Sequence, residues 1–498
     1  MSSSEESRQS LLNLFSPPDD RRRGIFGLVC GLSAEEQFMD SALERFTGFG
    51  RTSRKHTANF SLTLCRDIHT QPRWLAPGLY EPFPADQMPE TIKLMHAKVA
   101  LLGFGLSAAG EPDYYRLIVS TGNWNKEAVN HTINLVWFCD YPVTSTEDQR
   151  QNAADILEAV NFWRQLLGID NGKTGYYQLD DPARERIGHF LEALTANIPA
   201  PKNTEPRFIS NLLDGKAAQA DGGFQADSMG AQVIQRFSDT GMRRNLIVCG
   251  SGFFEQAAPG SKAGEPEVIR NLSGNLVKNK VLTKDADHWL VINPGTCGAA
   301  GRWIKNTDTD SLNWEICLPR HPDSKTTPYP FHAKYVFIGN NNDSSVTSGL
   351  LYLGSGNLSR QGFALSPGAG GNIEAGVIID TERYDYISEF CVDLGIDADK
   401  NLNLNDIPKE TEGEDSEQPE SELQAPPPIA SCVWIPKTRK LTWKWTDTSW
   451  NEVQLNGQLI PPGLVESIIP DPAADLSGGV KLSANKDGKP YDWLIPAG

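Results

Sequence analysis

A short stretch that occurs twice indicates both the fold and the chemistry of this chain: HAKVALLGFG at 96–105 and HAKYVFIGNN at 332–341. Each copy begins with His-Ala-Lys and continues into an apolar run typical of a buried strand. A second apolar run follows each copy and ends in small residues and an asparagine, as STGN at 120–123 and GSGN at 354–357. Because the order and the spacing are nearly the same, the sequence predicts one strand pair used twice.

The repeated residue types are those that could act on a phosphodiester. In an extended chain, residues two apart lie on the same side, so each His-Ala-Lys directs an imidazole and an ammonium toward one site. A histidine can act as nucleophile or move protons, while lysines and amides can stabilise charge on phosphoryl oxygens without a metal or other cofactor. A lone histidine or strand-end asparagine is usually structural, so the duplication carries this hypothesis. The predicted phosphate site contains His96, Lys98, Asn123, His332, Lys334 and Asn357.

Two HxK…N units with these flanks resemble the phospholipase D superfamily. Most lipases of that superfamily have an aspartate six residues after the lysine, where this chain has Phe104 and Asn340. The runs STGN followed by Asn134, and GSGNLS followed by NIEAGVII, are instead similar to the tyrosyl-DNA phosphodiesterases. The resemblance spans roughly 24–397 and is closest around the two motifs.

The resemblance implies that His96 is the nucleophile and forms a phosphohistidine. It implies that His332 first protonates the leaving oxygen and then activates water. Glu374 and Asn134 match the positions that orient the two histidines in the family. The family usually has glutamine at the latter position, and the shorter asparagine leaves either a direct contact or a water-bridged one open.

The implied substrate is a 3′-phosphotyrosyl or related adduct at a DNA end, and the implied function is DNA repair. Single-stranded DNA would lie on one side of the site and a peptide on the other. The alternatives are a nuclease or exonuclease, a phospholipid hydrolase of the same superfamily, and a non-catalytic scaffold that binds DNA ends or a protein. The missing aspartates argue against lipids, and two complete His-Ala-Lys units argue against a scaffold.

Composition favours an intracellular protein, cytoplasmic or nuclear, and two half-sites within one chain favour a monomer. The chain has 498 residues and a formal net charge of −17, which argues against binding nucleic acid by a general positive surface. Much of the acidity lies in one run at 409–422, so a local basic site is compatible with it. The sequence has no apolar run long enough to span a membrane and no secretory leader, and its eight cysteines lack CxxC spacing.

The predicted fold class is α/β, with two pseudo-repeated α-β-α sandwich halves that share one active site and a small C-terminal β module. Alternation of Trp434, Trp443 and Trp445 in the module favours core packing over ligand binding, and the module could also contact a protein partner. The predicted divisions are a flexible leader at 1–23, a first half at 24–204, a second half at 205–400, an acidic Pro-rich linker at 401–430 and the β module at 431–498.

Overall fold

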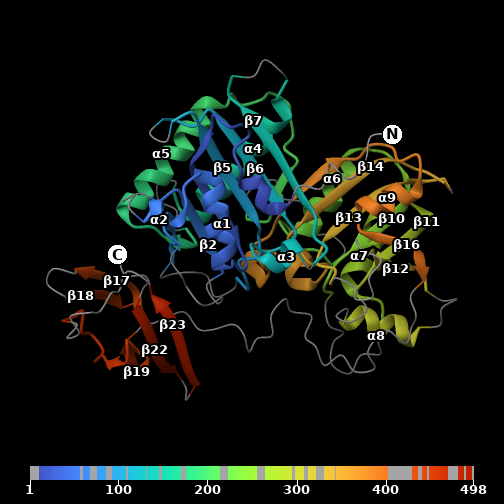
Figure 1. Ribbon diagram of the computed structural model, residues 1–498. Helices are drawn as coiled ribbons and strands as arrows, with labels where there is room; N and C mark the ends of the chain where they lie inside the picture. Colours follow the sequence, from blue (N-terminus) through green and yellow to red (C-terminus); the bar gives the residue numbers. More distant parts are fainter. Residues whose placement is uncertain are drawn as a thin grey trace.

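The computed structural model of the chain has two α/β parts and a separate group of C-terminal strands (Figure 1). It describes residues 10–55, 60–67, 76–85, 92–107, 110–130, 132–144, 148–169, 175–212, 223–254, 264–293, 298–307, 312–320, 330–342, 344–401, 429–435, 440–445, 448–468, 480–486 and 489–495.

The first sheet has the strand order β3-β2-β1-β5-β6-β7. Its central strand β1 pairs in parallel with β2 and antiparallel with β5. From β5 the sheet continues antiparallel through β6 to β7. The strands are β1 (Arg23–Gly31), β2 (Leu62–Arg66), β3 (Leu79–Tyr80), β5 (Val99–Gly105), β6 (Tyr114–Ser120) and β7 (Val136–Pro142).

The second sheet has the order β16-β12-β11-β10-β13-β14-β15-β9. Its strands are β9 (Phe208–Ser210), β10 (Arg244–Gly250), β11 (Leu282–Val291), β12 (Glu315–Pro319), β13 (Tyr335–Asn341), β14 (Val346–Gly354), β15 (Ala375–Asp380) and β16 (Ile396–Asn401).

Six strands of the second sheet repeat the arrangement of the first. The series β12-β11-β10-β13-β14-β15 corresponds to β3-β2-β1-β5-β6-β7. In both series the first three strands are mutually parallel and each later neighbour is antiparallel. The two His-Ala-Lys units therefore precede equivalent strands, β5 and β13.

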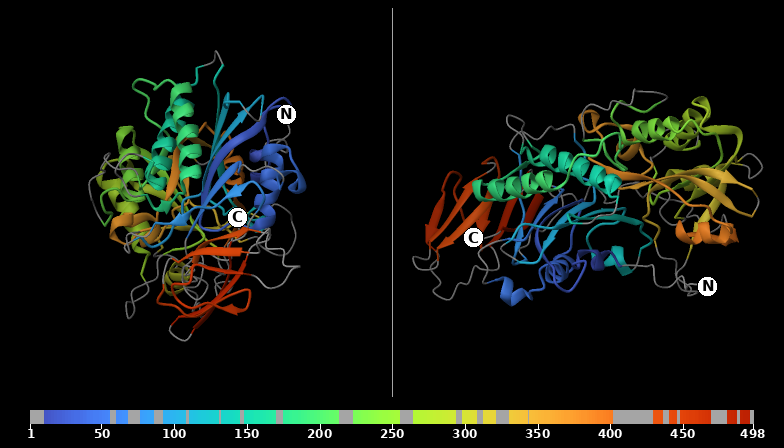
Figure 2. Two further views of the ribbon diagram at one scale, coloured as in Figure 1. Left: turned by 90° about the vertical axis from the view of Figure 1, so that its left-hand side faces the viewer. Right: turned by 90° about the horizontal axis from the view of Figure 1, so that it is seen from above.

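Alternation along the strands directs apolar side chains to both faces of each sheet. The outer face of the first sheet packs on α1, and the outer face of the second packs on α6, α7 and α8. Two views show the first sheet between α1 on one side and α4 with α5 on the other (Figure 2). The helices are α1 (Glu36–Thr47), α2 (Arg51–Arg54), α3 (Lys126–Asn130), α4 (Arg150–Leu167), α5 (Asp181–Asn197), α6 (Met229–Asp239), α7 (Glu267–Lys278), α8 (Gly298–Asn306) and α9 (Ile387–Asp393).

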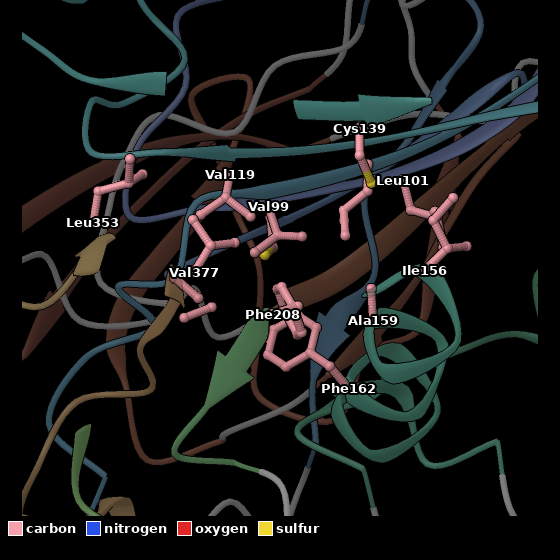
Figure 3. Close-up of a cluster of buried hydrophobic side chains, with 14 of the residues drawn as sticks. Val99, Leu101, Val119, Cys139, Ile156, Ala159, Phe162, Phe208, Leu353 and Val377 are labelled. Atoms are coloured by element: carbon pink, nitrogen blue, oxygen red, sulfur yellow. The ribbon is translucent and has the colours of Figure 1, made fainter. Parts of the chain in front are cut away.

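The inner faces of both sheets contribute to one continuous hydrophobic core. Val99 and Val119 from the first sheet and Leu353 and Val377 from the second belong to the same buried cluster. Figure 3 shows these side chains together with Phe162 of α4. Because this core joins both halves, the strand ends that carry the candidate residues are held in fixed relative positions.

The N-terminal segment is more ordered than the sequence predicts. The sequence predicts a flexible leader as far as Arg23, but Leu11–Phe15 forms the 3-10 helix η1. Leu14 and Phe15 are fully buried, and the guanidinium of Arg116 donates to the carbonyl oxygen of Leu14 at 2.9 Å. The polar residues around this short apolar run obscure its packing role in the sequence.

The C-terminal strands form two small sheets with their own core. Leu441, Trp443, Trp450 and Leu482 are among its buried residues, as expected for Trp443. Trp445 packs against this core, and the side chain of Trp434 lies outside the described residues. The strands are β17 (Ile429–Ile435), β18 (Lys440–Trp445), β19 (Asn451–Leu455), β20 (Gln458–Leu459), β21 (Glu466–Ile468), β22 (Val480–Lys486) and β23 (Lys489–Ile495).

Short elements complete the described fold. They are β4 (Phe83–Pro84), which pairs with β8 (Tyr177–Gln178), the π-helical turn η3 (Arg360–Ala364) and the 3-10 turn η4 (Pro367–Ala369). None of the helices in the described ranges combines the length and apolar character that crossing a membrane requires. The expected acidic linker lies almost wholly outside the described residues.

Candidate active site

The two His-Ala-Lys units lie immediately before β5 and β13 rather than within them. Ala97 and Ala333 are fully buried in the shared core. In an extended segment, the residues on either side of each alanine face the opposite way. These residues precede the hydrogen-bonded part of each strand.

Each histidine segment is paired with a segment of the other half. Two parallel bridges form between the halves, Met95 with Ile373 and Ile133 with Phe331. The backbone N–H of His96 donates to the carbonyl oxygen of Ile373 at 2.9 Å, and that of His332 donates to Ile133 at 3.0 Å. In both bridges the next residue along one strand is a histidine. The next residue along the other is Glu374 in the first bridge and Asn134 in the second.

His96 and Glu374 form a buried pair at the first bridge. Nδ1 of His96 lies 2.8 Å from each carboxylate oxygen of Glu374, and the side chains are 1% and 0% exposed. The hydroxyl of Ser355 donates to the same carboxylate, and Nδ2 of Asn372 donates to it at 3.1 Å. The carboxylate is thus held by three groups, and each contact fixes its direction toward His96.

This pairing determines which nitrogen of His96 can react. A carboxylate only accepts hydrogen bonds, so Nδ1 of His96 carries a proton and donates it in the hydrogen bond to Glu374. Chemistry at His96 therefore falls on Nε2. The negative charge of Glu374 also stabilises a positive charge on the imidazole.

His332 has a neutral partner at the equivalent place. Nδ1 of His332 lies 3.0 Å from Oδ1 of Asn134. Nδ2 of Asn134 donates to Ala128 O at 3.0 Å and to Thr132 Oγ1 at 2.6 Å, which leaves Oδ1 to accept from the histidine. The side chain of Asn134 is therefore long enough for a direct contact.

The two lysines differ in the hydrogen bonds that hold them. Both side chains are fully buried. Nζ of Lys98 donates to the carbonyl oxygen of His96 at 2.8 Å, within one half. Nζ of Lys334 lies 3.0 Å from each ring nitrogen of His332 and donates across the halves to Thr121 O at 3.2 Å. The ammonium group of Lys334 therefore lies beside the His332 imidazole, while that of Lys98 is held at the backbone of its own histidine.

Two hydroxyl residues, Thr121 and Ser355, support the orienting residues and were missed as site residues by the sequence reasoning. Their backbone N–H groups donate to Leu135 O and Ala375 O, at 3.0 and 2.9 Å, just after Asn134 and Glu374. Their hydroxyls accept from the N–H groups of Leu135 and Ala375 at 2.9 and 3.0 Å. The signal in the sequence was a hydroxyl two positions before each motif asparagine. Asn372, which also holds Glu374, had no such signal.

Asn123 and Asn357 follow β6 and β14 at equivalent places. Each precedes a residue in a parallel bridge, Trp124 with Ala34 and Leu358 with Phe254. Their Oδ1 atoms are buried and have no hydrogen-bond partner among the described residues. A half-turn of an amide exchanges its oxygen and nitrogen, so each side chain can present an acceptor or a donor to a bound group. Buried amides with unused hydrogen-bonding capacity are expected where a ligand binds.

Other nucleophiles and metal ligands do not form a competing site in the described residues. Within the ranges given above, no three His, Cys, Asp or Glu side chains are grouped to hold a metal ion. The six described cysteines are free and buried, and burial raises the pKa of the thiols of Cys30 and Cys249. The hydroxyls of Ser251 and Ser359 accept from the backbone N–H groups of Leu358 and Gly362.

No protein-family model and no curated protein sequence matches the chain. The fold is similar to that of yeast tyrosyl-DNA phosphodiesterase. One structure of that protein has a TM-score of 0.43 and 10% identity, with 74% of this chain and 86% of the yeast chain covered. Another, of its H432N_Glu mutant, has a TM-score of 0.45 and 11% identity, with 74% and 84% covered. Phosphatidylserine synthase of Haemophilus influenzae Rd KW20 has a TM-score of 0.41 and 12% identity, with 80% and 86% covered. TM-scores and identities in this range describe a likeness in the overall arrangement of helices and strands.

We expect Ser355→Ala to lower kcat by roughly 10- to 100-fold, because a hydrogen bond to a charged group contributes about 1.5–3 kcal/mol. The lost donor holds the carboxylate of Glu374, which orients His96. The matched variant is Ser355→Thr, which introduces the residue found at the equivalent position, Thr121, and should retain most activity. Steady-state kinetics with a melting curve for each variant test this, and equal activity of Ser355→Ala and wild type contradicts it.

Proposed function

We propose that this chain is a metal-independent phosphodiesterase that acts through a phosphohistidine on His96. We further propose that it hydrolyses 3′-phosphotyrosyl or related adducts at DNA ends. The observation that carries the proposal is the reciprocal pairing of the halves, in which each contributes a His-x-Lys unit and orients the histidine of the other. Two imidazoles, two ammonium groups and two amides are the groups that a phosphoryl transfer needs.

In the first step, Nε2 of His96 attacks phosphorus as the bond from phosphorus to the leaving oxygen breaks. His332, in its protonated form, gives a proton to that oxygen. Lys98 and Lys334 balance the charge that develops on the phosphoryl oxygens, and Asn123 and Asn357 donate hydrogen bonds to them. The products are the leaving alcohol or phenol and a phosphoramidate, in which phosphorus is bonded to Nε2 of His96 and still carries the DNA ester oxygen.

In the second step, neutral His332 removes a proton from water as the water oxygen attacks phosphorus. The bond between phosphorus and Nε2 of His96 breaks, and the phosphate monoester leaves. His332 ends the cycle protonated and His96 regains its lone pair. No step needs a metal ion, since the lysines supply the positive charge.

The different partners of the two histidines support this assignment of roles. A phosphorylated imidazole gains positive character, and the carboxylate of Glu374 is the group that stabilises it. His332 has only the neutral amide of Asn134 as its orienting partner, which suits a group that must both give and take a proton. Exchanging the roles would leave the carboxylate beside the proton donor and oppose proton release.

The substrate class rests on the motif resemblance: the absent lipase aspartates, with Phe104 and Asn340 in their places, and the runs STGN followed by Asn134 and GSGNLS followed by NIEAGVII. A single-stranded 3′ end would occupy one side of the site and the adduct the other. Both half-sites lie in one chain, so the proposed reaction needs no second copy.

We expect the wild-type chain to release a 3′-phosphate end from a labelled single-stranded oligonucleotide that carries a 3′-phosphotyrosine, with EDTA present. Product analysis on a denaturing gel measures this. Parallel reactions with an unmodified oligonucleotide and with phosphatidylcholine vesicles test the nuclease and lipase alternatives. Loss of cleavage in EDTA that zinc or magnesium restores would contradict the metal-free mechanism.

A further inference from the structure

Phe253 lies next to the histidine that we propose as the proton donor. Its ring centroid is 6.0 Å from that of His332, and the two ring planes are at 85°. This edge-to-face arrangement is a favourable one for aromatic pairs. Phe253 is half-buried and so keeps some exposure to solvent.

The backbone around Phe253 is held firmly. Ser251 and Phe254 are fully buried, and Phe254 forms a parallel bridge with Leu358. Gly252 approaches the His332 segment so closely that a Cβ there would lie 2.5 Å from Phe331 O. The position of the Phe253 ring is therefore set by the fold rather than by a freely moving loop.

The first half has no aromatic ring at the equivalent place. The bridge between Ala34 and Trp124 corresponds to the bridge between Phe254 and Leu358, so Ser33 is the counterpart of Phe253. At this pair of equivalent positions, the hydrophobic ring is thus present in the second half only. An asymmetry of this kind is expected where the two sides of a site receive chemically different parts of a substrate.

We propose that Phe253 is a specificity-determining residue that selects an aromatic group on the leaving oxygen. The inference rests on the proposed function, because the leaving oxygen must come within hydrogen-bonding distance of His332 to receive its proton. The first atoms attached to that oxygen then lie near the Phe253 ring. An aryl group can pack on this ring with a preferred offset or edge-to-face geometry, which a saturated ring of similar size cannot match.

The size of the effect follows from the strength of such contacts. An aromatic pair contributes about 0.5–1.5 kcal/mol beyond the area that it buries, which corresponds to roughly a 2- to 12-fold difference in rate constant. Phe253 makes no proton transfer, so its removal should slow cleavage of an aromatic ester more than cleavage of a non-aromatic ester. The expected result is therefore a change in the preference for an aromatic over a non-aromatic ester, and not an equal loss of activity on both.

The test compares kcat/KM for two 3′ esters of one oligonucleotide, a phenyl phosphodiester and a cyclohexyl phosphodiester. For wild type, Phe253→Leu and Phe253→Trp, the measured quantity is the ratio of the two values, which cancels general effects of each variant. We expect Phe253→Leu to lower the phenyl-to-cyclohexyl ratio by about 2- to 12-fold and Phe253→Trp to preserve it. Phe49→Leu is the matched control, since Phe49 is a partly exposed phenylalanine beyond α1.

Three results would overturn the inference. The ratio could be unchanged in Phe253→Leu while wild type cleaves both esters with dependence on His96, which would leave the proposed function standing. The variant could instead alter discrimination between a base and an abasic site at the 3′ nucleotide, which would move Phe253 to the DNA side. Failure of wild type to cleave either ester would contradict the proposed function and this inference with it.

Discussion

The variant His96→Ala is expected to lower kcat by roughly 10⁴- to 10⁶-fold, a loss of the size seen when a hydrolase loses its nucleophile. The reason is that no second group is placed to take over: Nδ1 of His96 donates to the buried carboxylate of Glu374, which leaves Nε2 of His96 to attack. Lys98 supplies charge and is not a nucleophile in the proposed reaction. Single-turnover cleavage of the 3′-phosphotyrosyl oligonucleotide measures the loss.

The variant His96→Ala should still bind the substrate. Lys98, Lys334, Asn123 and Asn357 remain in His96→Ala, so the substrate Kd, measured by fluorescence anisotropy, should change little. The control is His189→Ala, the same substitution on the exposed face of α5. Activity within tenfold of wild type would exclude His96 as the nucleophile. An intact biological effect of a catalytically dead His96→Ala would favour the scaffold alternative.

The second large effect is expected for His332→Asn, in which an adduct between substrate and His96 should accumulate. An asparagine can accept a hydrogen bond but cannot take the proton of the attacking water, so the second step should slow by roughly 10²- to 10⁴-fold. The first step should suffer less when the leaving group is a phenol, because a phenoxide leaves with less help from an acid. Denaturing electrophoresis of labelled DNA on the protein measures the trapped species.

The chemical behaviour of the adduct identifies its linkage. A bond from phosphorus to imidazole nitrogen is cleaved in acid and survives in alkali, unlike a serine ester. The double variant His96→Ala with His332→Asn should give no adduct. Adduct formation in that double variant, or its absence in His332→Asn during a single turnover, would contradict the assigned roles.

The core of the candidate site could be predicted because its chemistry is local in sequence. His96 and Lys98 are two residues apart, and the whole unit is repeated at His332 and Lys334, so alternation alone places each pair on one side. The α/β class followed from apolar runs that alternate with helical stretches. Both features depend on short-range spacing, which a sequence displays directly.

What could not be predicted depends on contacts between distant segments. Asn372 holds Glu374, yet nothing in its spacing from the motifs distinguishes it from a turn residue. The direct contact of Asn134 with His332 depends on how closely two halves approach, and a motif does not encode that distance. Burial of Phe15 against Phe38 and Trp124 could not be predicted for the same reason.

The bridge of Met95 with Ile373 and that of Ile133 with Phe331 determine how substitutions between the two halves affect activity. Within one polypeptide, the halves meet as the subunits of a symmetric dimer do, each completing the other. A substitution that shifts this internal interface should therefore disturb both histidines together, so such substitutions and those at His96 should show non-additive effects. Each half expressed alone should lack catalytic activity even if it folds. Mixing the two fragments should restore activity only if they reassociate.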